Sequence, residues 1–161
     1  MAKSPEFSST ASDIEDSPEA VFQFMLEQGW SDGLPVIPPT ADRVRAMLDY
    51  AQRDAGELIG YINPDAGSAT VEKIAVNAVM AGCLPEYMPV LIAAVQAITE
   101  PSFNIHGLQT TTNPVSPLLI VNGRVRDLIG LNSGRGTLGP GYRANATIGR
   151  AIRLLLLNVG G

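Results

Sequence analysis

The 161-residue chain has one cysteine, Cys83, and one histidine, His106. These counts exclude an intrachain disulfide and a cysteine-only metal site, and a zinc site would need carboxylate ligands. No apolar run approaches the roughly 18 residues that a membrane-spanning helix requires. The N-terminus lacks the charged-then-apolar pattern of a secretion signal. These absences predict a soluble, cytoplasmic protein that needs no metal.

Basic residues are also scarce, with 11 Lys and Arg against 16 Asp and Glu and a net charge of −5. Nucleic-acid-binding proteins show a basic surplus, so this class is disfavoured. Hydrophobic residues, in contrast, make up 45% of the chain, enough for the core of one domain. We predict a disordered tail over residues 1–16, which are rich in Ser, Asp and Glu, and a single domain over residues 17–161.

Helix signals recur along this domain. Ser17 followed by Pro18 and Glu19 is typical of a helix start, and Gly29 can end that helix. Thr40 is expected to cap a second helix. Further helices are expected over residues 69–81, 85–98 and 143–158.

Three stretches have the character of strands, namely residues 57–62, 103–112 and 117–122. The last is a continuous apolar run, PLLIVN, which we expect to be buried on both faces. Strands interleaved with helices predict an α/β fold. Its expected parts are a short, mostly buried sheet, a tight antiparallel hairpin of the two Ala-rich helices over 69–81 and 85–98, and an apolar C-terminal helix.

Three long segments carry a family resemblance. They are GWSDGLPVIPPTADRV (29–44), ATVEKIAVNAVMAGCLPEYMPV (69–90) and GPGYRANATIGRAIRLLLLNVGG (139–161). Together they resemble an uncharacterised bacterial family associated with redox proteins that carry a selenocysteine-or-Cys–Gly–Ser–Cys motif. Members of that family continue past the Asn-Val-Gly-Gly at the end of this sequence. The resemblance implies that the chain corresponds to an N-terminal half encoded separately, with a partner subunit resembling the C-terminal half.

The apolar C-terminal helix gives an independent hint of a partner. Ile152 and the leucines at 154–157 make it apolar nearly all round. A helix of this kind needs cover on every side. A partner chain would provide that cover more easily than a small domain alone.

Cys83 is the first candidate catalytic residue, because it precedes Pro85 and Glu86 at an expected helix start. Backbone N–H groups and the helix dipole there favour a nucleophilic thiolate. Glu86 is a candidate proton shuttle or dipole partner. The alternative is that Cys83 is a small hydrophobic residue packed between two helices.

His106 is the second candidate, for acid–base chemistry. On a strand over 103–112 it would share a face with Asn104, and the hydroxyl of Thr111 would follow in the same segment. The alternative is a histidine satisfied by backbone carbonyls.

The loop over residues 134–145, GRGTLGPGYRAN, is the main binding candidate. Its glycines let backbone N–H groups approach a ligand, and the following helix start favours an anion. Two arginines can clamp a carboxylate or phosphate. It matches neither a Walker A loop nor a dinucleotide fingerprint, and it can equally be a long surface turn. The residues proposed to bind are Arg135, Gly139, Gly141, Arg143 and Asn145.

Other positions carry weaker signals. Asn122 ends the expected buried strand, where α/β sheets place ligands. Asp32 lies in a loop fixed by Pro and Gly and is expected either to act there or to cap a turn, with Trp30 packed on the core. Glu72 and Lys73 are expected on a solvated helix face.

These signals favour a subunit of an enzyme acting on a small anionic molecule, with the site completed by a partner chain. The association with redox proteins suggests thiol-dependent oxidoreductase or lyase chemistry, and no cofactor is indicated. One alternative is a non-catalytic scaffold subunit that docks a catalytic partner through its apolar C-terminal helix. Another is a small-molecule binding module without chemistry.

Overall fold

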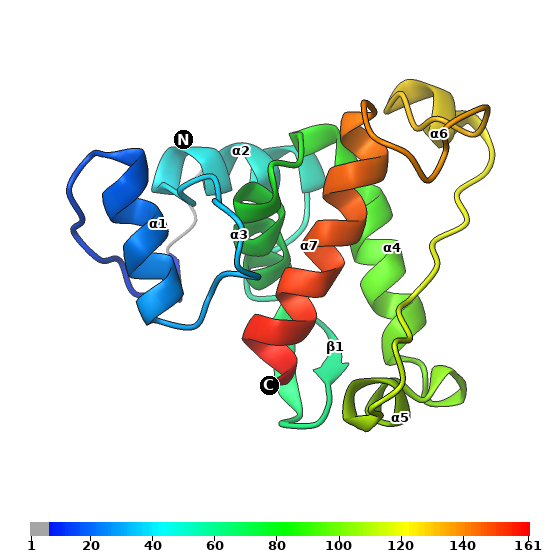
Figure 1. Cartoon of the computed structure of the whole chain (residues 1–161), viewed down its shortest axis with the longest axis horizontal. Coiled ribbons are helices and arrows are strands. Elements are labelled where there is room, and N and C mark those ends of the chain that lie inside the picture. The colour runs from blue at the N-terminus through cyan, green and yellow to red at the C-terminus, as the bar shows by residue number, and fades with distance from the viewer. Residues whose placement is uncertain (1–6) are drawn as a thin grey trace.

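The computed structural model describes residues 7–161, and its helices account for about half of their length (Figure 1). They are α1 (Pro18–Glu27), α2 (Ala41–Ala51), α3 (Val71–Ala81), α4 (Met88–Thr99), α5 (Ile105–Thr110), α6 (Arg124–Leu128) and α7 (Arg143–Gly160). Strands β1 (Leu58–Ile62) and β2 (Gly67–Thr70) pair antiparallel in a two-stranded sheet. Short 3-10 helices, η1 (Pro85–Tyr87) and η2 (Pro101–Phe103), precede α4 and α5. The fold is a single α/β domain.

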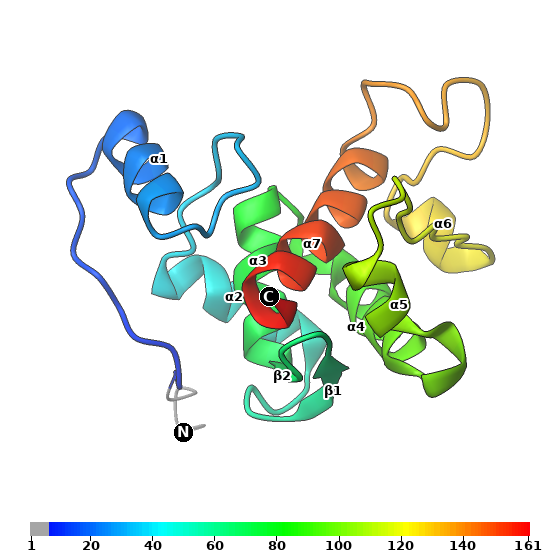
Figure 2. The ribbon, with the colours of Figure 1, turned by 60° about the horizontal axis from the view of Figure 1, so that its bottom comes forward.

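Helix α7 lies at the centre of this domain. It contacts α3, α4 and both strands, and Figure 2 shows its C-terminal end close to the β-hairpin. Five of its large apolar side chains are at most 3% exposed, namely Ile148, Ile152, Leu154, Leu155 and Leu156, whereas Leu157 and Val159 are half-buried. The cover that the sequence analysis assigned to a partner chain is therefore supplied by the chain itself.

The end of α7 packs tightly on the turn between the strands. The amide of Asp65 donates to the carbonyl of Gly160 over 2.9 Å. A side chain at Gly67 would collide with the backbone carbonyl of Val159. Glycine at position 67 thus permits the helix to end against the hairpin.

The predicted helix starts differ in whether a side chain caps them. The Ser17 hydroxyl accepts from the Ala20 amide over 3.1 Å, as expected of an N-cap. Thr40 occupies the N-cap position of α2 without a side-chain hydrogen bond, whereas Thr70 caps α3 by accepting from the Lys73 amide. The expected Ala-rich helices are present as α3 and α4, which contact each other while α7 packs against both.

Two predicted strands are wrong. Residues 103–112 form the end of η2 and the short helix α5, because Asn104 adopts a left-handed conformation (φ 56°) and caps α5 by accepting from the Gly107 amide. Residues 117–122 are extended but pair with no strand, and Leu118 and Ile120 are 75% and 81% exposed. The run expected to be buried on both faces therefore lies at the surface.

A bidentate ion pair fixes the loop between α1 and α2. Arg150 of α7 donates to the two carboxylate oxygens of Asp32 over 2.9 and 2.8 Å, and also to the carbonyls of Leu34 and Pro35. Asp32 accepts from the Leu34 amide as well, so it also caps the expected turn. Trp30 is 42% exposed and packs edge-to-face on Phe24, with ring centroids 5.9 Å apart, rather than in the core.

Glu72 is buried, not solvated as expected, with 1% of its surface exposed. Its carboxylate accepts four hydrogen bonds, from the amides and hydroxyls of Ser8 and Ser9. Burial would raise the pKa of Glu72, but these donors outweigh it and hold the pKa below its ordinary value. Of the tail expected over residues 1–16, residues 1–6 lie outside the described part of the chain.

We predict that Asp32→Asn lowers the free energy of unfolding by roughly 2–4 kcal/mol at neutral pH, because it leaves Arg150 without its carboxylate partner. The hydrogen bond from Arg150 holds the pKa of Asp32 below its ordinary value. The stabilisation is therefore complete above about pH 4 and is lost as pH falls through the lowered pKa. Denaturant unfolding at several pH values measures it.

The matched control is Asp42→Asn, since the Asp42 side chain is 95% exposed in its ion pair with Arg45. This variant should unfold like the parent protein. An equal loss of stability in both variants, or a loss from Asp32→Asn that persists unchanged at pH 2, would contradict the assignment.

Candidate functional site

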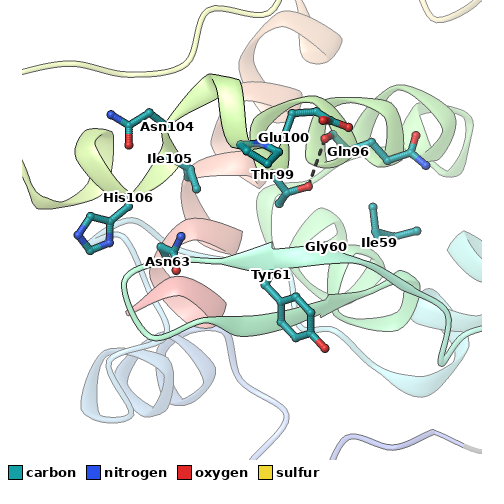
Figure 3. A pocket seen from close by; sticks show the side chains of 11 residues that line it. Ile59, Gly60, Tyr61, Asn63, Gln96, Thr99, Glu100, Asn104, Ile105 and His106 are labelled. Carbon is teal, nitrogen blue, oxygen red and sulfur yellow. Dashed lines mark hydrogen bonds between the residues drawn. The ribbon is translucent and has the colours of Figure 1, made fainter.

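A cavity of about 770 Å³ opens between β1, the end of α4 and α5 (Figure 3). Figure 3 shows His106, Asn104 and Asn63 at one end of this hollow and Gln96 and Ile59 at the other. Most of the residues that line it are polar. Of the site residues predicted from the sequence, only His106 and Asn104 are among them. The polar lining residues are Tyr61, Asn63, Gln96, Thr99, Glu100, Asn104 and His106.

Local structure explains how the hollow is built. A side chain at Gly60 of β1 would collide with Thr99, so the glycine lets the strand approach the end of α4. The Thr99 hydroxyl donates to the carbonyl of Val95, which keeps it against its own helix. The Asn104 cap then starts α5, and this places His106 in the first turn with its side chain exposed.

The chemistry of the hollow follows from its lining. Glu100 is the only carboxylate in it, and no Lys or Arg lines it. The amides of Asn63, Gln96 and Asn104 donate and accept hydrogen bonds, and an imidazole transfers protons near neutral pH. The arrangement suits a small polar molecule better than an anion.

Cys83 is 5% exposed in the turn between α3 and η1. Burial raises the pKa of its thiol to about 11, and a hydrogen bond with Thr147 and the charge of Arg143 only partly oppose this. The expected thiolate is therefore wrong. The helix-start argument failed because the desolvation of a buried sulfur outweighs the favourable field of the helix end.

Cys83, Glu86 and Arg143 do lie together. The Arg143 guanidinium donates through Nε to the carbonyl of Gly82 over 2.9 Å, and the charges of Arg143, Cys83 and Glu86 all act on Tyr87. Arg143 and Glu86 are exposed, whereas Cys83 is buried. The group is a contact between the start of α7 and the turn before α4.

His106 does not join this group. Cys83 lies before the first turn of α4 and His106 lies after its last turn. A helix of 12 residues is about 18 Å long, and Figure 1 places the start of α7 and helix α5 at opposite ends of α4. The two candidate catalytic residues therefore belong to different regions.

The glycine-rich loop forms many of its hydrogen bonds within itself. The amides of Gly134, Thr137 and Gly139 donate to oxygens of residues 132–136. The Asn145 side chain accepts from the Asn132 amide and donates to the carbonyls of Asn132 and Thr137. Asn145 thus organises the loop, while Arg135, Gly139 and Gly141 are exposed.

The two remaining binding candidates lie at either end of an extended segment. Thr111 follows α5, and its hydroxyl accepts from the Asn113 amide. Asn122 is exposed just before α6 and ends no sheet strand. Neither residue lines the hollow.

Sequence reasoning missed most of the hollow. Tyr61, Asn63 and Glu100 come from segments separated by more than 30 positions, and only the packing of β1 on α4 brings them together. One signal in the sequence could have indicated this site: polar residues at the ends of two apolar elements, β1 and α4. Arg150 was missed because its partner lies 118 positions earlier.

Comparison with protein-family models, with curated proteins and with solved structures finds no match. Within residues 7–161, no three His, Cys, Asp or Glu side chains are grouped so that they could hold a metal ion. No described helix is both long and apolar enough to cross a membrane. The family resemblance stays a prediction.

We predict that Cys83 reacts with iodoacetamide at pH 7.5 at least about 100-fold more slowly than a free thiol. A rise in pKa from 9.0 to about 11 lowers the thiolate fraction by that factor, and burial limits access further. Mass spectrometry of the alkylated protein measures the rate. The same protein unfolded in urea should react like a free thiol, and fast labelling of the native chain would refute the assignment.

Proposed function

We propose that this chain is a subunit of a larger assembly and that residues 111–142, here called the arm, bind another polypeptide chain. The carrying observation is the exposure of apolar side chains along the arm, up to 93% at Leu138. Where exposed apolar side chains gather on a surface, they are typical of protein–protein contacts. The exposed apolar residues are Val115, Leu118, Ile120, Leu128, Leu138 and Tyr142.

The position of the arm supports this proposal. Figure 1 shows it running from α5 along the outside of the domain to α6 and back to the start of α7. Only the short helix α6 interrupts its irregular course. Burying a Leu or Ile side chain stabilises by about 1.5–3 kcal/mol, so Leu118, Ile120 and Leu138 together offer several kcal/mol to a partner.

The proposal changes the expected docking surface. A scaffold that docks through its apolar C-terminal helix would need that helix exposed, but the apolar side chains of α7 are covered by α3, α4 and the hairpin. Among residues 7–161, the arm carries the most exposed of the large apolar side chains, namely Leu118, Ile120, Leu128 and Leu138. A second subunit, as the family resemblance implies, is a partner class that suits it.

The second candidate function is an enzyme acting on a small polar molecule, and the hollow beside His106 supports it. His106 would serve as the acid–base group and Glu100 would favour a neutral or cationic substrate. The burial and raised pKa of the Cys83 thiol disfavour thiol-dependent chemistry. The hollow is open to one side, and a neighbouring chain would complete it.

We predict that a variant combining Leu118→Ser, Ile120→Ser and Leu138→Ser keeps the melting temperature of the isolated chain but loses the assembly. These side chains are exposed, so their removal costs the lone subunit little. Native mass spectrometry of the tagged protein from its own host measures the assembly. The parent should exceed the 17.0 kDa of the single chain, and the variant should not.

The matched control is Leu155→Ser, whose side chain is 1% exposed in α7. It should lower the melting temperature strongly, because it leaves a polar group and a cavity in the core. A parent protein found only at 17.0 kDa would refute the proposed function. A triple variant as unstable as Leu155→Ser would show that the arm packs within its own chain.

A further inference from the structure

We infer that residues 117–121 of the arm are an open strand edge and that a second copy of this chain occupies it, antiparallel, about a twofold axis at Leu119. The inference rests on the proposed function, because it names the partner for one part of the arm. It leaves Leu128 and Leu138, at the far end of the arm, for another subunit.

The backbone of this stretch is unpaired. Residues 114–122 contain no turn or bend, and Figure 1 shows this stretch drawn out between α5 and α6. Over residues 116–122, no backbone amide or carbonyl forms a hydrogen bond with any other residue of the described 7–161. Apart from Pro117, which has no N–H, the stretch therefore offers free N–H and C=O groups, and a neighbouring strand pairs with such a row.

The exposure of the side chains shows which face of this stretch lies against the domain. Leu119 and Val121 pack against the core, whereas Leu118 and Ile120 point outward. This alternation is that of a β-strand with one face on the domain. Within the chain itself the stretch is not a strand, because no other described segment pairs with it.

The absence of charge favours a second copy as that partner. Natural proteins protect strand edges with charged side chains and with proline, which keep identical copies from pairing. Residues 115–123, VSPLLIVNG, contain no charged residue, and their one proline, Pro117, lies at one end of the proposed strand. The net charge of −5 opposes association only weakly, because salt screens it beyond about 8 Å. Twofold pairing of identical surfaces is also the commonest mode of oligomerisation.

The alternation also selects the register. Residues directly opposite in an antiparallel pair share a face, so the axis must pass through a residue rather than between two. An axis at Leu119 places Leu118 of each copy opposite Ile120 of the other, which forms two apolar contacts. An axis at Ile120 would instead place Leu118 opposite Asn122.

The test uses the full chain carrying Leu119→Cys. At the axis the two new thiols lie on opposed residues, whose Cα separation of about 4.5–5.5 Å suits a disulfide. Mild oxidation should give a covalent dimer in at least half of the protein. Val121→Cys is the matched control: it has the same inward orientation but lies two residues from the axis, so oxidation should not crosslink it into a covalent dimer. The native thiol, Cys83, is buried and does not interfere.

Sedimentation equilibrium at about 0.1 mM chain supplies the second measurement. The parent should be a dimer, and Ile120→Arg should weaken the dimer at least about tenfold, while Leu128→Arg should not. A parent that is monomeric overturns this inference and leaves the proposed function to the native assembly. A dimer that Ile120→Arg disrupts, but that does not crosslink through Leu119→Cys, also overturns strand pairing while it supports the arm as the docking surface.

Discussion

The apolar side chains of α7 leave water only when α3, α4 and the β-hairpin surround them, and this requirement organises the domain. Arg150 on the same helix holds the loop before α2, and Gly160 meets the hairpin turn. Helices that cover α7 are not free to cover anything else. The long connection between α5 and α7 therefore runs over the surface, where Leu118, Ile120 and Leu138 remain in water.

The helices were predictable because their signals are local. Serine and threonine caps, apolar residues at helical spacing and small residues mark α1 to α4 and α7 within the sequence itself. Residues 103–112 misled because a six-residue helix is too short to show a helical period, and its start depends on the left-handed backbone of Asn104. The stretch 117–122 was predicted to be buried because it is apolar. Its hydrophobicity shows that burial would be favourable, but it does not show that another part of the same chain covers it.

The candidate site was less predictable because it depends on contacts distant in sequence. Cys83 was placed correctly at a helix start, but its reactivity depends on burial beneath neighbouring side chains, which the sequence does not show. Asn145 was expected to touch a ligand, and it holds its own loop together instead. His106 lines a hollow, but much of the remaining lining comes from β1 and the end of α4. No sequence motif connects those elements to His106.

The four hydrogen bonds that reach Glu72 hold Ser8 and Ser9 over its buried carboxylate, although both serines are exposed and belong to no helix or strand. A protease that cut within residues 10–16 and released these serines would deprive the carboxylate of all four donors. Water would have to replace them, or the carboxylate would have to take up a proton. A segment without secondary structure can thus cover the charged start of a helix, and its loss would be felt at α3.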